Sequence, residues 1–282
     1  MSDESIPGLS AEDGLTWRRV FNHLAILVAF LTVWEMLTVT GIADELLYPR
    51  PTLIIYSFYS LFIDQGIVWR HLWITMATVL SGFVVGTILG ISLAVVAGLS
   101  ETARRYMKPY IIVLEATPRI AIGPLMLAWL GFGFEAKLAI VTLVCFFAPF
   151  INTLTGFLSA DEDQIELMRS LGASKWQILT KAMVPDAMPL IMAGIRLAMA
   201  SALGGALVAE FISSNEGMGV LLNNLAAVLQ MSAAFAALLT LTVLGFFLYR
   251  IMESLESWII FWHHDDSMRR VARKRQTYWS KL

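Results

Sequence analysis

The stretch ATVLSGFVVGTILGISLAVVAGL, from Ala77 to Leu99, holds no charged side chain. A helix rises about 1.5 Å per residue, so about 20 apolar residues are enough to cross a hydrocarbon core roughly 30 Å thick. Lipid offers no partners to backbone N–H and C=O groups, so a helix is the expected form of such a segment. The stretch therefore predicts a transmembrane helix, and the residues before it allow the helix to begin as early as Val68.

The composition of the whole chain points the same way. Of its 282 residues, 57% are apolar and 15% are charged, and the mean hydropathy is +0.69. Soluble domains are about 45–50% apolar and about 25% charged, so this balance argues against a soluble globular protein and excludes a disordered one. We predict an all-α polytopic membrane protein with six transmembrane helices. The predicted spans cover residues 20–39, 77–99, 108–130, 137–158, 188–212 and 233–252.

The third predicted span is irregular. It contains Pro109, Pro118 and Pro124, and a proline inside a helix removes a hydrogen-bond donor and crowds the preceding turn. Irregular backbone at membrane depth must face protein or a water-filled cavity. Two interpretations are open, a simple kink and a broken helix that lines a pathway.

Small residues inside the spans predict how the helices pack. Gly82, Gly86 and Gly90 recur every four residues, which forms a ridge that another helix can approach closely. That helix belongs either to the same subunit or to a second copy of the chain. Cys145, the single cysteine, excludes an internal disulfide and a cysteine-based metal cluster, and its apolar neighbours predict a small buried side chain.

The positive charges predict the orientation in the membrane. With six spans both termini lie on one side, which receives fifteen of the 20 Lys and Arg residues, whereas the opposite side receives three. Cytoplasmic loops are enriched in Lys and Arg, so both termini are predicted to be cytoplasmic. The basic tail is most simply a topology signal beside anionic lipid. The net charge of −2 gives no sign of a nucleic-acid partner.

The spans divide the chain into regions. Residues 1–19 are a polar cytoplasmic tail, whose acidic composition is unlike the basic start of a cleavable signal peptide. Residues 20–67 hold the first transmembrane helix and an outer loop. Residues 68–256 form the core domain, which includes a cytoplasmic loop at 159–187, and residues 257–282 form the basic tail.

The loop at 159–187 is long for a chain with so little polar sequence, and a long connection needs a reason. Asp161 and Asp163 are suitable N-caps for a helix. Gly172 can reverse the chain because glycine tolerates positive φ, and Pro185 ends the segment. The pattern predicts two short helices around a glycine turn. They form either an interfacial hairpin that only caps the bundle or a docking element for a cytoplasmic partner.

From Glu166 to Pro185 the loop reads E-L-M, three residues, G, nine residues and A-x-V-P. This pattern resembles the signature loop of ABC-importer permeases, which reads E-A-A, three residues, G, nine residues and I-x-L-P. Glu166, Gly172 and Pro185 match the signature in identity and spacing. The departures from it are Leu167, Met168, Ala182 and Val184.

The resemblance extends over most of residues 68–256 and points to the permeases of the nitrate, sulfonate and taurine group. The residues that carry it are His71, Thr75, Gly82, Gly86, Gly90, Pro109, Pro118, Pro124, Trp129, Gly131, Phe132, Gly133, Pro149, Asn152, Thr153, Gly194, Ile195, Arg196, Ala209, Glu210, Gly217 and Gly219. Such permeases have a five-helix core, so the resemblance implies that the span at 20–39 is an added N-terminal helix.

The resemblance also implies partners: a second permease copy in a homodimer, two ATP-binding subunits and an external solute-binding protein. The chain contains no G-x-x-x-x-G-K-[ST] loop, so ATP and Mg²⁺ are expected on the partner ATPase and no cofactor on this chain. The expected setting is a bacterial inner membrane, with lipid around the chain and no nucleic acid. The residues expected to couple to the ATPase are Glu166, Leu167, Met168, Leu171, Gly172, Ala173, Ser174 and Pro185.

Ionisable residues at membrane depth are candidates for the substrate pathway, because desolvating a charge is costly. They are Glu115, Arg119, Arg196 and Glu210. Each also has a structural interpretation. Glu115 and Arg119 would pair at i,i+4 if the helix continued past Pro118. Arg196 would extend to the cytoplasmic interface, and Glu210 would lie at the outer interface.

The sequence thus predicts the permease subunit of an ATP-driven importer for a small solute such as nitrate, a sulfonate, taurine or a related organic anion. The alternative is a proton- or ion-coupled secondary transporter, because broken helices and membrane carboxylates suit such a carrier. An intramembrane enzyme is a third class. The chain has neither H-E-x-x-H nor G-x-S-x-G, so no catalytic or metal-binding residue is assigned.

Overall fold

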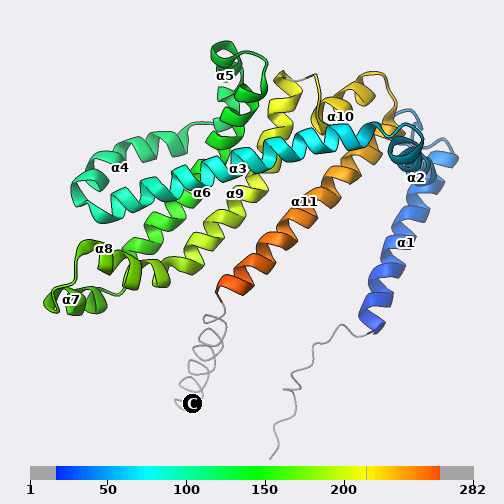
Figure 1. Ribbon diagram of the computed structural model, residues 1–282. Helices are drawn as coiled ribbons and strands as arrows, with labels where there is room; N and C mark the ends of the chain where they lie inside the picture. The colour runs from blue at the N-terminus through cyan, green and yellow to red at the C-terminus, as the bar shows by residue number, and fades with distance from the viewer. Residues whose placement is uncertain (1–16, 214, 261–282) are drawn as a thin grey trace, which may run out of the picture.

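The computed structural model describes residues 17–213 and 215–260, and every regular element among them is helical (Figure 1). The α-helices are α1 (Trp17–Val39), α2 (Pro51–Tyr59), α3 (Ile67–Leu99), α4 (Glu101–Ala116), α5 (Gly123–Leu130), α6 (Phe134–Leu158), α7 (Glu162–Ser170), α8 (Lys175–Ile178), α9 (Val184–Ser213), α10 (Met218–Ala227) and α11 (Met231–Ile259). Short π-helical segments occupy Ser60–Asp64 and Leu179–Met183, and Arg119–Ile122 form a 3-10 turn. The predicted all-α fold class is confirmed.

Five helical runs in the described part of the chain are long and apolar enough to cross a membrane. They are α1, α3, α6, the run that ends in α9, and α11. These helices correspond to five of the six predicted spans. The early start predicted for the second span is confirmed, because α3 begins at Ile67.

The third predicted span, residues 108–130, is not one helix. Helix α4 already begins at Glu101 and ends at Ala116, Thr117 is extended, and α5 begins only at Gly123. Pro118 accounts for the break, because a proline disfavours helical geometry in the residue before it and cannot donate a backbone hydrogen bond. Pro109 stays inside α4, and Pro124 lies in the first turn of α5, where its missing N–H is no loss. The predicted irregularity of this segment is therefore confirmed. The prediction of one continuous span from residue 108 to residue 130 was wrong.

The core is built on α6, which packs against both α3 and α9, and the three helices share one buried cluster. A Cβ at Gly86 of α3 would lie 2.7 Å from the carbonyl oxygen of Thr142 and 2.9 Å from Cβ of Cys145. On α9, a Cβ at Gly194 would lie 2.9 Å from the carbonyl oxygen of Ala148. The glycine ridge of α3 therefore packs against α6 of the same subunit, which confirms the first of its two interpretations. Cys145 is fully buried, as predicted.

Helix α1 stands apart from this core, and Thr38, near its end, is the one buried residue of its span Val20–Val39. Its carboxylate Glu35 accepts hydrogen bonds from the backbone N (3.2 Å) and Oγ1 (2.7 Å) of Thr52 in α2. Trp34 packs edge-on against Phe235 of α11, with 5.9 Å between the ring centroids. These contacts attach α1 near its C-terminal end. This arrangement agrees with the expectation that α1 is an added helix outside the core.

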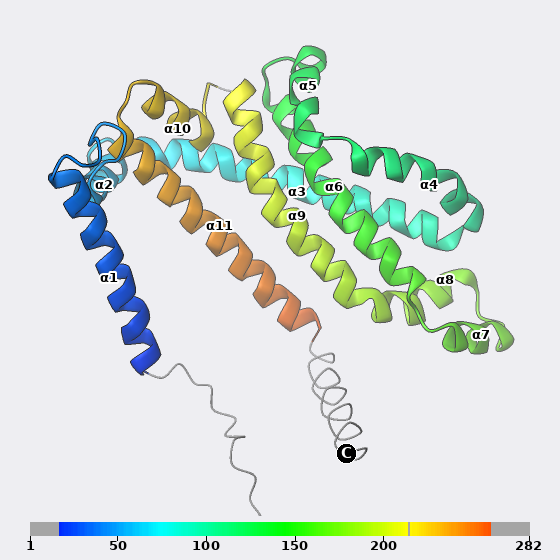
Figure 2. The ribbon, with the colours of Figure 1, turned by 180° about the vertical axis from the view of Figure 1, so that it is seen from behind.

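The helix ends fall into two groups (Figures 1 and 2). Helices α7 and α8, the last turns of α11 and the start of α1 lie at the lower end in both views, which we call the hairpin end. Helices α2, α5 and α10 lie at the opposite end, which we call the α10 end. This grouping places together the segments that the charge count assigns to one side of the membrane.

The packing of α3 on α6 predicts opposite outcomes for one added methyl group at two glycines. Gly86→Ala should lower the melting temperature of the purified protein in detergent, because overpacking costs about 1–3 kcal/mol. Gly204→Ala is the matched control, since a Cβ there meets nothing within 4 Å. It should leave the melting temperature unchanged or slightly higher. Equal melting temperatures for the two variants would contradict the assigned contact.

Candidate functional site

The predicted cytoplasmic loop forms a helical hairpin. Helix α7 is capped by Asp161, whose side chain accepts a hydrogen bond from the backbone N of Asp163 at 2.9 Å. Glu162 and Asp163 lie in its first turn, where carboxylates complement the helix dipole. None of the α7 residues is buried, so the helix projects from the protein.

Gly172 ends α7 in a Schellman motif. Its backbone N donates to the carbonyl oxygen of Arg169, and the backbone N of Ala173 donates to that of Met168, both at 3.0 Å. The φ of Gly172 is +80°, which other residues adopt only with strain, and a Cβ there would meet nothing within 4 Å. The predicted glycine turn is confirmed.

Helix α8 begins with a capping box. The backbone N of Ser174 donates to Oε1 of Gln177 (2.7 Å), and the backbone N of Gln177 donates to Oγ of Ser174 (3.3 Å). Leu179 then fixes the base of the hairpin, because it packs in a buried cluster with Phe157 of α6 and Ile191 of α9. The hairpin therefore has a tip held by its own hydrogen bonds and a base anchored between two core helices.

The tip of the hairpin exposes apolar side chains. Leu167, Leu171 and Trp176 are 61%, 78% and 60% exposed. Large apolar groups on a short polar hairpin mark a contact surface, since water solvates them poorly. Of the other predicted coupling residues, Met168 and Ala173 are half-buried, and Glu166, Gly172, Ser174 and Pro185 are exposed.

Arg196 of α9 forms an ion pair with Glu256 of α11, and its guanidinium lies 5.7 Å from the ring centroid of Tyr249. Both charged side chains are about a third exposed or less. The sequence did not indicate these partners, because they lie more than fifty positions further along the chain. A place for Arg196 in the substrate pathway stays a prediction.

The side chains of Glu115 and Arg119 lie outside the described part of the structure. The backbone shows that Glu115 belongs to α4 and Arg119 to the 3-10 turn beyond Thr117. The helical i,i+4 spacing considered for this pair is therefore absent. Glu210 is described and almost completely buried, at 1% exposed, where Thr75 and Gly219 donate hydrogen bonds to it. Its predicted contact with substrate is untested.

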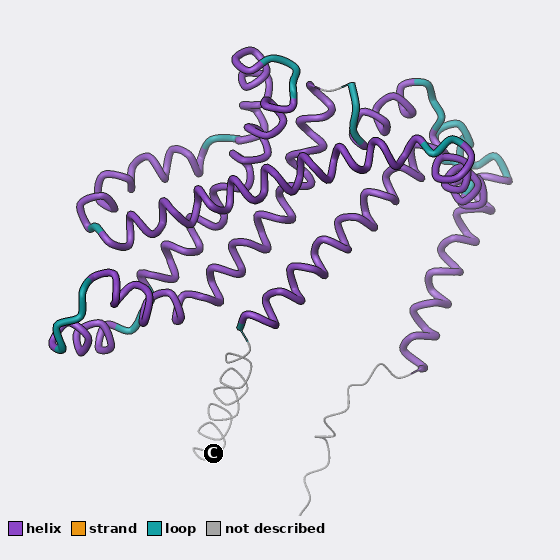
Figure 3. Tube along the Cα trace, in the orientation of Figure 1, coloured by secondary structure: helices purple, strands orange, loops and turns teal. Residues whose placement is uncertain are grey.

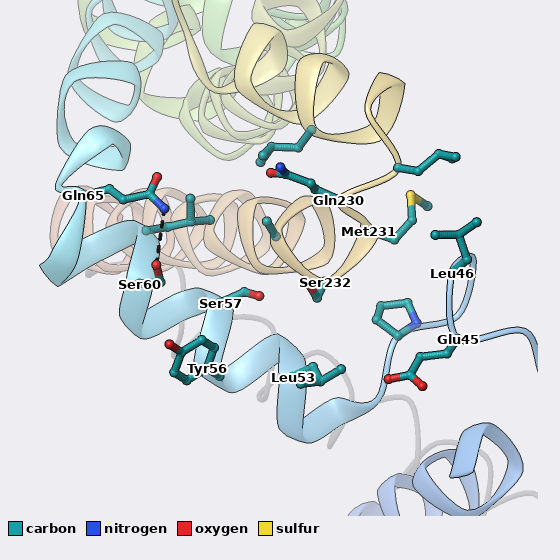
Figure 4. Close-up of a pocket in the computed structure, with 15 residues that line it drawn as sticks. Glu45, Leu46, Leu53, Tyr56, Ser57, Ser60, Gln65, Gln230, Met231 and Ser232 are labelled. Carbon is teal, nitrogen blue, oxygen red and sulfur yellow. Dashed lines mark hydrogen bonds between the residues drawn. The ribbon is translucent and has the colours of Figure 1, made fainter. Parts of the chain in front are cut away.

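A cavity of about 290 Å³ opens at the α10 end, between α2 and the turn that joins α10 to α11 (Figure 4). Serine, glutamine and leucine side chains line it, and Leu229 adopts a positive φ of 58° in that turn. Glu45 contributes the single carboxylate of the lining and is paired with Arg50 at 2.8 Å.

The model of a protein family described as the binding-protein-dependent transport system inner membrane component matches residues 82–261, more than half of the chain. The chain belongs to this family of ABC-importer permeases. The permease is 28% identical over 248 residues to the putative aliphatic sulfonates transport permease protein of Bacillus subtilis, which covers 88% of each chain. It is 26% identical over 250 residues to the taurine transport system permease protein of Escherichia coli, covering 87% of this chain and 91% of the relative.

Other comparisons agree. The riboflavin transport system permease protein of Chloroflexus aurantiacus is 30% identical over 237 residues, covering 84% of this permease and 88% of the relative. A solved structure of the MetNI methionine ABC transporter, in an inward-facing conformation, contains a chain that matches with a TM-score of 0.62. The match is 16% identical and covers 70% of this permease and 97% of that chain, so it shows the shared fold. Family membership decides against the alternative of a secondary transporter.

The ion pair of Arg196 allows its two interpretations to be separated. Arg196→Gln should destabilise the permease by about 1–2 kcal/mol, because it leaves Glu256 without its cation in a half-buried site. The double variant Arg196→Gln/Glu256→Gln should recover the lost melting temperature, since the two amides can hydrogen-bond. Uptake by the assembled importer is measured in parallel. Recovery of stability without recovery of uptake would place Arg196 in the substrate pathway.

Proposed function

We propose that this permease forms the substrate pathway of an ATP-driven importer and couples it to a cytoplasmic ATPase through the hairpin of residues 159–187. The observation that carries the proposal is the hairpin itself. It combines a Gly172 turn at the signature spacing, an exposed apolar tip and a buried base. The hairpin end is assigned to the cytoplasm, with both termini, because most Lys and Arg residues fall on that side.

The assembly we propose contains two copies of this permease, two ATP-binding subunits and an external solute-binding protein. ATP and Mg²⁺ bind to the partner ATPase, and no cofactor is assigned to this chain. The relatives described above are named as permeases for aliphatic sulfonates, taurine and riboflavin. For this chain we propose a small solute such as nitrate, a sulfonate, taurine or a related organic anion.

The anchored base of the hairpin suggests how a movement of the ATPase would be transmitted to the transmembrane helices. Closure of the ATPase pair on ATP would displace the tip, at Leu167, Leu171 and Trp176. Leu179 is buried between α6 and α9, so the displacement would tilt both helices rather than bend the loop. Packed interfaces switch between discrete arrangements, which would convert the tilt into a change of access from one side to the other.

The docking assignment is tested with two matched glycine substitutions. Gly172→Trp should abolish co-purification of the ATP-binding subunit in mild detergent, because the indole would fill the space that the partner occupies. Gly41→Trp is the control, since Gly41 also has a positive φ (75°) with nothing within 4 Å of a Cβ, but precedes α2 at the α10 end. It should retain the subunit.

Two outcomes would count against the proposal. If the ATPase remains bound to Gly172→Trp, the coupling site lies elsewhere. If it is absent from the wild type as well, the assembly is wrong.

A further inference from the structure

The α10 end contains a buried carboxylate whose two oxygens are both hydrogen-bonded. Glu210 lies near the end of α9 and is 1% exposed. Oγ1 of Thr75, in α3, donates to Oε1 at 2.7 Å, and the backbone N of Gly219, in α10, donates to Oε2 at 2.8 Å. A single side chain therefore connects three helices.

Thr75 makes a second hydrogen bond, so its hydroxyl links α10 to Glu210 as both acceptor and donor. Its hydroxyl accepts a hydrogen bond from the backbone N of Met218 at 2.8 Å while it donates to Glu210. Thr75 is fully buried, so both bonds are shielded from bulk solvent. The first N–H groups of α10 have no partners within their own helix, and here α3 and α9 supply them.

Glycines allow the backbone to wrap around the carboxylate. A Cβ at Gly217 would overlap the carboxyl group of Glu210, and the φ of Gly217 is 131°. A Cβ at Gly219 would lie 3.0 Å from Cβ of Glu210. Gly217 lies in the loop that precedes α10 (Figure 3), and only glycine fits at this position because any side chain would overlap Glu210.

Further contacts surround this centre. The backbone N of Gly217 donates to Nδ1 of His71 at 3.0 Å, and Arg70 forms an ion pair with Glu216. Lys137 of α6 is buried too, and its positive charge interacts with Glu210. We call the set of His71, Thr75, Glu210 and Gly217–Gly219 the outer tie.

Breaking the hydrogen bonds of the outer tie would cost much free energy. A buried carboxylate and two buried backbone N–H groups would lose their partners, and such losses cost more than the loss of an exposed bond. The chain also has segments that deform more easily. One is the break between α4 and α5 at Pro118, where the helical hydrogen bonding is interrupted.

We propose that the outer tie joins the first half of α3, the last turns of α9 and the start of α10 into one rigid block that stays closed throughout the transport cycle. This inference rests on the proposed transport function. Glu210 is then a positioning residue rather than a substrate ligand, and the change of access takes place at other segments.

The ion pair on the rim of the tie provides a direct test. Arg70 and Glu216 have side chains that are 72% and 41% exposed, so a reagent can reach them. In a Cys145→Ala background, Arg70→Cys and Glu216→Cys are combined and joined by a short thiol-reactive linker in vesicles that contain the whole importer. ATP-dependent uptake should stay within about two-fold of that of the same variant without linker. Each single cysteine variant, treated with linker, is the control.

A loss of uptake of ten-fold or more that appears only in the linked double variant would overturn the rigid block. Failure of the proposed function looks different, because the variant without linker and the parent would then show no ATP-dependent uptake.

Substitutions at the centre separate positioning from substrate contact. Thr75→Ser keeps the hydroxyl and should retain the melting temperature and uptake. Thr75→Val removes both bonds and should lower the yield of folded permease. Glu210→Gln sets an amide donor against either the N–H of Gly219 or the O–H of Thr75. It should lower the melting temperature and leave KM for the transported solute unchanged. A stable Glu210→Gln protein with a KM raised ten-fold would overturn the positioning role.

Discussion

The close approach of α3 and α9 to the backbone of α6 is the constraint on which the rest of the structure depends. In a bilayer, apolar side chains gain little by leaving lipid, so helices associate through tight van der Waals contact and a few polar bonds. Gly86 and Gly194 bring their helices against carbonyl oxygens of α6, at Thr142 and Ala148. With these three helices fixed, the hairpin base at Leu179 has a firm support. The loop before α10 likewise has two helices to bind.

The sequence predicted the features that depend on local pattern. Long apolar runs identified five spans, the spacing from Glu166 to Pro185 identified the hairpin, and three prolines indicated an irregular third span. Hydropathy missed the start of α4, because its first turns carry Glu101 and basic residues. A local signal was available there, since Ser100 caps the helix by accepting from the backbone N of Ala103 at 3.2 Å.

Contacts between distant residues were beyond such patterns. Thr75 and Glu210 are 135 positions apart, and Arg196 meets a residue on another helix. A charged residue at membrane depth indicates a costly position but does not say whether a substrate or a neighbouring helix compensates it. The sequence could therefore name Glu210 and Arg196 as candidates, whereas their protein partners came only from the fold.

The hydrogen bonds inside the hairpin have a consequence for the speed of assembly. The Schellman motif at Gly172 and the capping box at Ser174 hold both short helices in shape with bonds from the hairpin alone. A partner would then meet a surface that is already ordered, so little conformational entropy is lost when the two proteins associate. A hairpin that keeps its shape without a partner can bind and release one repeatedly without refolding.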